Sequence, residues 1–470
     1  MTLYHYRSIR SALLEIKNIS FHFAARDELN DPIEGYVHVV WRGDKAAWEG
    51  LFRNYICSAY HTICQYLLKA NEETLHHKSL IKDSRPYDLI PLSQEFSVLG
   101  LSFLKDAEVQ KLASFYGDHT LLVQEDELKF ILHYLHSKAL ILCIQSLKEK
   151  RCIPVQEANM LLDMFSSTTQ ASFPYEVVAD NLPDEKARSL IMKIAEGCLE
   201  DMVEKRYASL GWSNVSFLHG YHLKEKNGAS GRSAEARQQR DWMTITVDYP
   251  SVYVEQLKDM IYPKAYVVCF STENTNSVMW GNYADNHKGV CLVYETDEKN
   301  SLMAKGSLDE VSPVTIVRYG GDMIERNFFE TFGRMTRPQI KTWLTGLEDI
   351  SSSFEVFADE DTWRKKYWEA FEAKTYQKDR AWAYEKEYRI TLTGMLQDYS
   401  DPGSRNLKYD PKRLKGVIFG IKTSEYDKMR ILKALRKHEA KYEGFKFFQA
   451  EYDAWSQSVS VREKKLWKLL

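Results

Sequence analysis

The sequence predicts an α+β fold in which a large helical insertion interrupts a single core. Segments that alternate apolar and polar residues, as β-strands do, lie at the two ends of the chain, within residues 1–44 and 241–460. Between them, from 45 to 223, apolar residues recur at three- and four-residue spacing, which is typical of amphipathic helices. No internal repeat is visible, so we expect the two ends to share one core.

The N-terminal part of the core contains two short predicted strands and a turn. "LYHYRS" (3–8) and "ISFHFA" (19–24) alternate along their length, and "IRSALLEI" between them has the spacing of a short helix. "LNDPIEG" (29–35) combines Asn, Asp, Pro and Gly, which favour turns. We therefore expect strand, helix, strand and turn in this order.

The insertion at 45–223 is built from long amphipathic segments such as "AAWEGLFRNYICSAYHTICQYLLKA" and "DELKFILHYLHSKALILCIQSLKEK". It is followed by "KEKNGASGRSAEARQQR" (224–240), which is rich in Gly, Ser and charged residues and is predicted to be a mobile linker loop. If the protein binds a partner protein, we expect the contact on this insertion.

Strand signals return after the linker, with helical stretches near 321–380 and 424–440 between them. The predicted strands are "WMTITVDY" (242–249), "AYVVCFS" (265–271), "GVCLVYE" (289–295), "YEKEYRITLTG" (384–394), "LKGVIFGIK" (414–422) and "GFKFFQAEY" (444–452). "CFSTENTNSVMW" (269–280) is polar and helix-like where it separates two of these strands.

Composition and charge argue against several classes of protein. The 470 residues carry a formal net charge of −3, so no overall field attracts nucleic acid. Seven scattered cysteines form no disulfide framework, and we expect free thiols in a reducing cytoplasm. The N-terminus lacks the pattern of a signal peptide, and the longest apolar run, "ALILCI" (139–144), is too short to span a membrane.

No motif for a metal or a phosphate is complete in the sequence. Cys57 and His61 are four residues apart on one helix face and Cys64 follows, but no second pair completes the four ligands that zinc prefers. Glycine loops of the P-loop or dinucleotide type are absent, and so is a nucleophile elbow. We expect no metal.

Two acidic residues at alternate positions, Glu385 and Glu387 in "YEKEYRI", are the candidates for catalysis. In a strand both would face the same side, and burying them without partners would be costly. Two interpretations are open. Either this is an edge strand whose acids lie in water or pair with Arg389, or one of the carboxylates is catalytic.

Five stretches carry a resemblance to a known family: "LYHYRS", "LNDP-E", "CFS…N…MWGNYADNHKGVCLVYE", "K…W.YEKEYRI" and "LKGVIFG". They closely resemble domain-of-unknown-function family 2971, a bacterial family. The resemblance covers both ends of the chain and leaves out the helical block. It implies no activity.

A second, more distant resemblance lies in the order of a few residues. His5 stands between aromatic residues in the first strand, Phe270 lies at the end of a later strand, and Ser277 precedes Trp280 by three positions on a short helix. "GVCLVYE" follows, and a late strand carries Glu387 in "EYRI". This order is similar to the ADP-ribosyltransferase fold in its poly(ADP-ribose) polymerase-like form, and it implies a split-sheet core of that type.

The resemblance implies that NAD is the substrate and that no metal is needed. Ser277 would hydrogen-bond the carboxamide, and Trp280 would lie against the nicotinamide ring, which is cationic in NAD⁺ and attracted to indole. Glu387 would hold the ribose 2′-hydroxyl and stabilise the positive charge that grows as nicotinamide leaves. The residues assigned to NAD binding are His5, Tyr6, Arg7, Phe270, Ser271, Ser277, Trp280 and Tyr283.

A second register is open within the same fold. Its Arg-Ser-Glu branch uses a first-strand Arg, a Ser-Thr-Ser strand and a Glu-X-Glu pair, which "YRS", "FST" and "EKE" resemble. In this register Arg7 takes the place of His5 at NAD, and Glu385 orients the acceptor. Tyr6 and Trp280 depart from the family pattern, which has a small residue and a Tyr at these positions.

The leading functional hypothesis is ADP-ribosyl transfer from NAD to a macromolecule, protein or nucleic acid, or plain NAD cleavage. Bacterial proteins of this resemblance are often toxins or anti-phage effectors, which is an analogy at the level of the fold. The alternative is a non-enzymatic module that binds a nucleotide or a nucleic-acid end in the same aromatic pocket. Each assigned residue also has a structural interpretation, as a strand-packing residue, a helix cap or a core anchor.

Overall fold

The computed structural model describes residues 1–70, 94–118, 121–167, 193, 197–206, 208, 243–304, 311–321, 323–394, 397–455 and 457–464. The chain divides into two compact units, each made from separate segments. The sheet unit comprises Met1–Val37, Pro263–Ile324 and Trp368–Leu470, and the helical unit comprises His38–Tyr262 and Glu325–Tyr367. The linker predicted at 224–240 lies outside the described residues.

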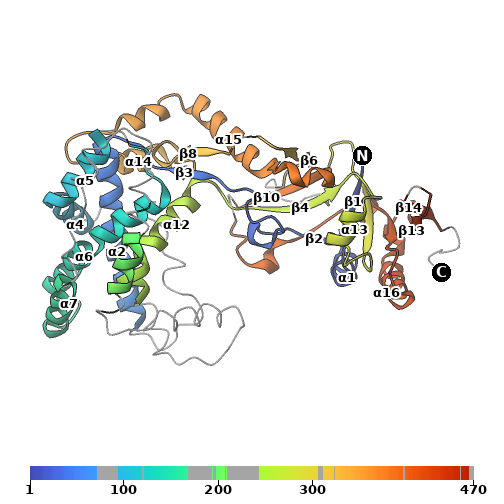
Figure 1. Ribbon diagram of the computed structural model, residues 1–470, viewed down its shortest axis with the longest axis horizontal. Coiled ribbons are helices and arrows are strands. Elements are labelled where there is room, and N and C mark those ends of the chain that lie inside the picture. The colour runs from blue at the N-terminus through green and yellow to red at the C-terminus, as the bar shows by residue number, and fades with distance from the viewer. Residues whose placement is uncertain are drawn as a thin grey trace. The chain divides into compact units, whose positions relative to one another are not determined.

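The centre of the sheet unit is an eight-stranded, mostly antiparallel sheet (Figure 1). From edge to edge its strands are β14 (Ser458–Glu463), β13 (Lys446–Asp453), β12 (Leu414–Phe419), β5 (Val290–Glu295), β1 (Thr2–Arg7), β4 (Ala265–Ser271), β10 (Glu387–Thr393) and β6 (Thr315–Ile316). β12 and β13 pair in parallel. Both ends of the chain contribute strands, and the fold is α+β as the sequence predicts.

The register of this sheet brings three strands together at one point. β1 lies between β4 and β5, with Tyr4 opposite Ser271 and His5 opposite Leu292. On the other side of β4, Glu387 at the start of β10 also lies opposite Ser271. Ser271 therefore marks the place where β1, β4 and β10 meet.

Helix α1 (Ile9–Asn18) packs an apolar face into the core of the sheet unit. Ser8 caps the helix by accepting a hydrogen bond from a first-turn backbone N–H, which would otherwise lack a partner. Ile9, Leu13 and Ile16 recur at helical spacing and are all buried. Burying each of these side chains stabilises the fold by about 1.5–3 kcal/mol.

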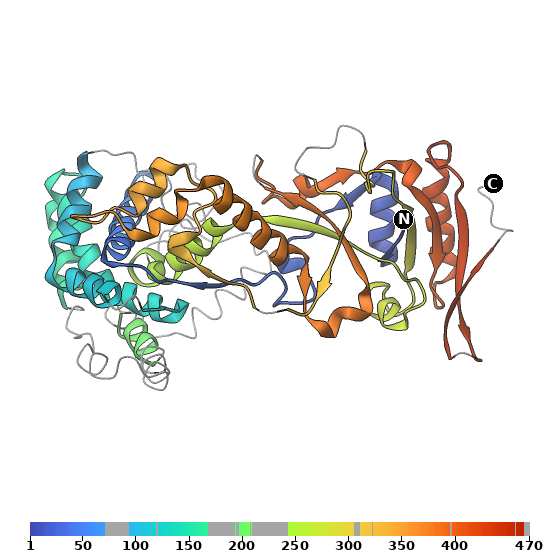
Figure 2. The same cartoon turned by 90° about the horizontal axis from the view of Figure 1, so that it is seen from above.

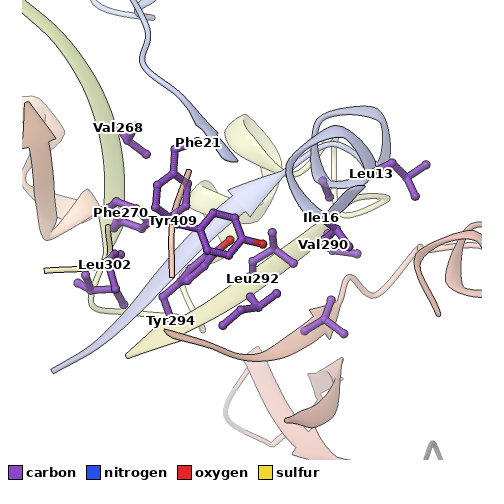
Figure 3. Packing of buried hydrophobic residues seen from close by; sticks show 14 of the residues in the cluster. Leu13, Ile16, Phe21, Val268, Phe270, Val290, Leu292, Tyr294, Leu302 and Tyr409 are labelled. Atoms are coloured by element: carbon purple, nitrogen blue, oxygen red, sulfur yellow. The ribbon is translucent and has the colours of Figure 1, made fainter. Parts of the chain in front are cut away.

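Aromatic rings form another part of this core (Figure 3). The rings of Phe21, Tyr294 and Tyr409 lie against one another, with centroids 4.8, 5.2 and 5.4 Å apart. β2 (Ser20–His22) pairs with β11 (Asn406–Lys408), which brings Phe21 beside Tyr409. Such edge-to-face and tilted arrangements are favourable for aromatic quadrupoles, so these rings hold segments that are distant in sequence.

Shorter elements complete the sheet unit. They are helices α13 (Ser277–Tyr283) and α16 (Glu425–Arg436), the 3-10 helix η5 (Arg380–Glu385), and strands β7 (Arg318–Tyr319) and β9 (Gln377–Lys378), which pair in parallel. α15 (Glu360–Tyr376) lies within the helical stretch that the sequence predicts near 321–380.

The helical unit contains the described part of the predicted insertion (Figure 2). Its described α-helices include α2 (Lys45–Ala70), α4 (Gln94–Leu104), α5 (Ala107–Asp118), α6 (Glu125–Glu149), α7 (Val155–Ser167), α12 (Tyr249–Ile261) and α14 (Arg337–Trp343). Its strands β3 (His38–Val40) and β8 (Glu325–Asn327) pair in parallel.

Helix α6 is long and apolar enough to cross a membrane by length and composition alone. However, 67% of its most apolar window, which has a mean hydropathy of 1.3, is buried inside the protein. Core helices commonly share these properties, and we interpret α6 as one. The expected cytoplasmic location stays a prediction.

One predicted strand is wrong. Residues 244–248 of "WMTITVDY" form a π-helical turn that continues directly into α12. Ile245 and Val247 are buried, which explains the β-branched composition without a strand. His136 Nε2 lies 2.9 Å from the carbonyl oxygen of Ile245, so the π turn has a partner in α6. Residues 249–261 accordingly belong to the helical unit, although the sequence places them in the core.

Candidate functional site

A cavity of about 210 Å³ opens in the sheet unit beside the point where β1, β4 and β10 meet. Charged side chains from five separate segments contribute to its wall. They are Arg7 of β1, Glu28 of the 3-10 helix Arg26–Glu28, Glu34 of the turn at 29–35, Lys378 of β9, and Glu385 and Glu387 at the junction of η5 and β10.

Glu385 and Glu387 converge on one ammonium group. Glu385 ends η5, Glu387 begins β10, and Lys386 between them has a left-handed conformation with φ 45°. Lys378 Nζ donates hydrogen bonds to Glu385 Oε2 at 2.7 Å and to Glu387 Oε2 at 3.2 Å. The two acids therefore meet through a tight turn, whereas the sequence predicts alternation within a strand.

A third carboxylate, Glu34, completes a buried group of charges. Its Oε2 lies 3.3 Å from Lys378 Nζ, and its Oε1 pairs with Arg389 Nη2. Arg389 also donates from Nε to Glu387 Oε1 at 2.5 Å and from Nη2 to Glu387 Oε2 at 2.9 Å. We call Glu34, Lys378, Glu385, Glu387 and Arg389 the carboxylate cluster; none of these side chains is more than 5% exposed.

The structure thus combines features of both interpretations of the acidic pair. Glu387 does pair with Arg389. However, β10 lies between β4 and β6 and is not an edge strand, and neither carboxylate lies in water. Burying paired ions is costly unless their geometry is good, so the cluster is weak support for stability alone.

The carboxylate cluster shifts the pKa values of Glu385 and Glu387 in opposite directions, because its three carboxylates share only two cations. Burial alone would raise the pKa of Glu387, but Arg389 and Lys378 outweigh it and hold the pKa at about 2. Burial raises the pKa of Glu385 above its ordinary value, since Lys378 and Tyr283 compensate for it only in part. Glu387 is therefore the ionised acid, and Glu385 takes up a proton more readily.

Helix α13 brings Tyr283 to the cavity but leaves Ser277 outside it. Tyr283 lines the cavity, and its hydroxyl donates to Glu385 Oε1 at 2.5 Å. Asn276 caps the helix, with its Oδ1 accepting two first-turn N–H groups. Ser277, predicted to bind the carboxamide, is exposed and lies 3.5 Å from His287 Nε2, away from the lining residues.

Trp280 occupies the core, which corrects the predicted stacking on a ligand ring. Its side chain is 0% exposed and it is not part of the cavity wall. The indole meets the Tyr6 ring edge-on at 5.1 Å, packs with Met279 and Ile418, and donates from Nε1 to the carbonyl of Asn274 at 2.8 Å. Through these contacts Trp280 anchors α13 in the core of the sheet unit.

The two competing first-strand residues, His5 and Arg7, share one partner that the sequence analysis missed. Glu15 of α1 is buried, with Oε1 at 3.2 Å from His5 Nδ1 and Oε2 accepting from Arg7 Nε at 3.0 Å. Both first-strand residues line the cavity. The structure therefore places His5 and Arg7 together and does not choose between them.

The other assigned residues of β1 and β4 mainly support the wall. Tyr6 packs against Trp280 and donates from its hydroxyl to the carbonyl of Glu273 at 2.8 Å. Phe270 is buried with its ring centroid 4.8 Å from that of His5. Ser271 Oγ donates to the Glu385 carbonyl at 2.7 Å, which fastens the end of η5 to β4.

A comparison with protein families identifies the core region of this site. Residues 279–390 match the family model described as "Protein of unknown function (DUF2971)". This region of the chain, less than half of its 470 residues, is similar to DUF2971. Neither a search of curated proteins nor a search of solved structures found a match, so the more distant resemblance to ADP-ribosyltransferases stays a prediction.

The DUF2971 match contains Tyr283 and four members of the carboxylate cluster, whereas Glu15 and Glu34 lie outside it. The sequence patterns assigned no role to three residues that help to build this site, Glu15, Glu34 and Lys378. Glu34 stands in "LNDPIEG", a stretch whose Asn, Asp, Pro and Gly predicted only a turn. Glu15 lies in a segment with an ordinary helix pattern, which gave no signal, and Lys378 stands in the stretch "K…W.YEKEYRI", where only the two acids were assigned a role.

Within the described part of the chain, no group of three His, Cys, Asp or Glu side chains is arranged to hold a metal. The expectation that no metal is bound stays a prediction. The arrangement offers an ionised carboxylate, a second carboxyl that takes up a proton more readily, and a phenol in the cavity wall that donates a hydrogen bond to the second carboxyl. Such a set suits chemistry in which positive charge develops on a substrate and a proton is then removed.

Proposed function

We propose that this protein cleaves the bond between ribose and nicotinamide in NAD⁺ and passes the ADP-ribosyl group to a macromolecule or to water. The observation that carries the proposal is the convergence of Glu385 and Glu387 on one cavity wall together with His5 and Tyr283. The order of strands in the sheet also supports the proposal, because β10, β4, β1 and β5 lie side by side in this order. These strands supply the residues on which the resemblance to ADP-ribosyltransferases rests.

The proposed reaction uses the two carboxyl groups in turn. The bond from ribose C1′ to the nicotinamide nitrogen breaks, and its electron pair goes to that nitrogen, which neutralises the ring. The positive charge passes to the ribose, where the ionised and buried Glu387 stabilises it. The acceptor oxygen or nitrogen then bonds to C1′ and gives its proton to Glu385.

Cavity size is consistent with one end of the dinucleotide. At about 210 Å³ the cavity is smaller than the 300–1,000 Å³ that is typical of drug-sized ligands. We therefore place the nicotinamide and its ribose inside, with the adenosine end beyond the mouth. Trp280 takes no part in this proposal, and Tyr283 is the aromatic residue beside the reacting groups.

The alternative, a non-enzymatic module for a nucleotide or a nucleic-acid end, relied on an aromatic pocket. Burial of Trp280 removes the strongest aromatic candidate from the cavity wall. The acceptor of ADP-ribose, a partner at the helical insertion and a role as toxin or anti-phage effector are proposals by analogy with other proteins.

Product analysis tests the proposal. The purified protein is incubated with NAD⁺, and nicotinamide and free ADP-ribose are separated by chromatography, with and without added protein and nucleic acid as acceptors. Nicotinamide with equimolar free ADP-ribose indicates cleavage by water, and nicotinamide with ADP-ribose attached to an acceptor indicates transfer. Binding of NAD⁺ without release of nicotinamide under any of these conditions would favour the binding module.

A further inference from the structure

Glu15 is a buried acid on a helix whose other buried positions are mostly apolar. Ile9, Leu13 and Ile16 pack α1 into the core, yet Glu15 between them is also buried. Apolar packing needs no charge at this position, and an isolated buried carboxylate would be strongly unfavourable. The position therefore requires an explanation in the partners of Glu15.

The carboxylate of Glu15 accepts hydrogen bonds from three side chains. His5 Nδ1 lies 3.2 Å from Oε1, Arg7 Nε lies 3.0 Å from Oε2, and the Tyr294 hydroxyl donates to Oε1 at 2.6 Å. Two of these donors are at alternate, cavity-lining positions of β1, and the third lies on the neighbouring strand β5. One acid thus connects α1 to both candidate NAD-binding residues of the first strand.

The ionisation of Glu15 determines which nitrogen of His5 carries a proton. Burial alone would raise the pKa of Glu15, but His5, Arg7 and the Tyr294 hydrogen bond hold it at about 2. An ionised carboxylate only accepts hydrogen bonds, so His5 Nδ1 must be the N–H donor. Burial, with the positive Arg7, lowers the pKa of His5, which keeps the ring neutral and leaves a lone pair on Nε2.

We infer that Glu15 is a positioning residue of the cavity. It fixes His5 in the Nδ1–H tautomer, so that Nε2 is the ring nitrogen left to accept a hydrogen bond from a bound ligand, and it holds the Arg7 guanidinium beside the ring. Nε2 has no hydrogen-bond partner among the residues that the structure describes. The effect of Glu15 on NAD turnover rests on the proposed function, whereas its control of the His5 tautomer does not.

The tautomer is measured directly by NMR of protein labelled with ¹⁵N-histidine, with His5→Gln used to assign the His5 signals. We expect neutral His5 in the wild-type protein to show a protonated Nδ1 and an unprotonated Nε2. Glu15→Gln should give a mixture of tautomers, because an amide both donates and accepts. A wild-type His5 with the proton on Nε2 would overturn the inference, even if Glu15→Gln failed to fold.

Kinetics give the second readout. His5 and Arg7 are assigned to NAD binding, so Glu15→Gln should raise KM for NAD⁺ and lower kcat/KM by about 10- to 100-fold, with a smaller change in kcat. Glu15→Asp, which keeps the charge on a shorter side chain, should recover part of the loss. A merely structural Glu15 would instead reduce the active fraction and leave KM unchanged, which would contradict the inference.

A matched control is the same substitution in a surface ion pair. Glu451 accepts a hydrogen bond from Lys464 Nζ at 2.7 Å on β13, far along the sheet order from β1. Glu451→Gln should leave both the His5 tautomer and KM at wild-type values. If wild-type protein releases no nicotinamide, the proposed function fails, but the tautomer measurement still decides whether Glu15 positions His5.

Discussion

Lys378 Nζ donates a hydrogen bond to Glu385 Oε2 across 2.7 Å, and neither side chain is more than 5% exposed. The same ammonium lies within ion-pair distance of Glu34 and Glu387. Well-packed apolar side chains often replace buried ion pairs without loss of stability. A protein that needed only a stable core would therefore not require this cluster, which supports a role in chemistry at the cavity.

Removing the ammonium should destabilise the sheet unit strongly. Lys378→Met leaves three buried carboxylates to share Arg389, and we expect a loss of about 3–5 kcal/mol in the free energy of unfolding. The measurement is urea unfolding followed by circular dichroism. Lys464→Met, which breaks an exposed pair with Glu451, is the control and should cost no more than about 1 kcal/mol. Equal effects of the two substitutions would show that the cluster is not a coupled buried network.

Acid should weaken the sheet unit through Glu387. The folded-state pKa of this acid is about 2, against an ordinary value of 4.5, so between these values the unfolded chain binds more protons. The stability that Glu387 contributes is therefore present above about pH 4.5 and is lost as the pH falls toward 2. Unfolding free energies measured from pH 6 to pH 3 should decline less steeply for Glu387→Gln than for the wild type. Parallel curves would contradict this assignment.

Trp280 should behave as a core residue. Trp280→Ala removes a fully buried indole and the hydrogen bond to Asn274, and we expect a loss of about 3–5 kcal/mol. Trp455 is 99% exposed, so Trp455→Ala should change stability by no more than about 0.5 kcal/mol. Denaturant unfolding of both variants provides the comparison. A small effect of Trp280→Ala together with loss of NAD⁺ binding would restore the stacking role.

The helical unit should lose stability in mild acid through His136. Its Nε2 donates to the Ile245 carbonyl, so Nδ1 accepts from the Tyr55 hydroxyl at 2.7 Å and has no room for a proton. Burial, with nearby Arg206, holds the pKa of His136 well below 6.5. Below about pH 6.5 His136 binds a proton in the unfolded chain but not in the folded chain. The free energy of unfolding therefore falls as the pH decreases.

Thermal unfolding at pH 7 and pH 5 measures this effect. His136→Gln should reduce the difference in Tm between the two pH values, although it lowers the Tm at pH 7. The half-buried His438, changed in the same way, should leave the wild-type difference intact. An unchanged pH difference in His136→Gln would exclude His136 as its source.

Local patterns predict much of this fold, because they depend only on side-chain period. Alternation in "LYHYRS" gives β1, and the buried spacing of Ile9, Leu13 and Ile16 gives α1. "WMTITVDY" misled the prediction because a short β-branched run is compatible with either a strand or a buried helix. Tertiary packing, through contacts such as that of His136 with Ile245, decides such cases.

Residue patterns alone, apart from the resemblance to a known fold, predicted the candidate site only where its residues are close in sequence. Glu385 and Glu387 stand two positions apart, and the pattern of two acids in an apolar strand drew attention to them. Glu34 and Arg389 meet only after two ends of the chain combine in one unit, and no local pattern encodes that contact. Trp280 was assigned to the wrong face because a two-turn helix leaves its rotation undetermined by sequence.

The most direct test of the central claim is the rate of nicotinamide release from NAD⁺ by wild-type protein, Glu387→Gln and the surface control Glu451→Gln. If Glu387 stabilises the ribosyl cation, wild-type protein and Glu451→Gln should release nicotinamide at similar rates. Glu387→Gln should be slower by about 100-fold or more, with its fold intact by circular dichroism. Release by folded Glu387→Gln at the wild-type rate, or no release by any of the three proteins, would contradict the account.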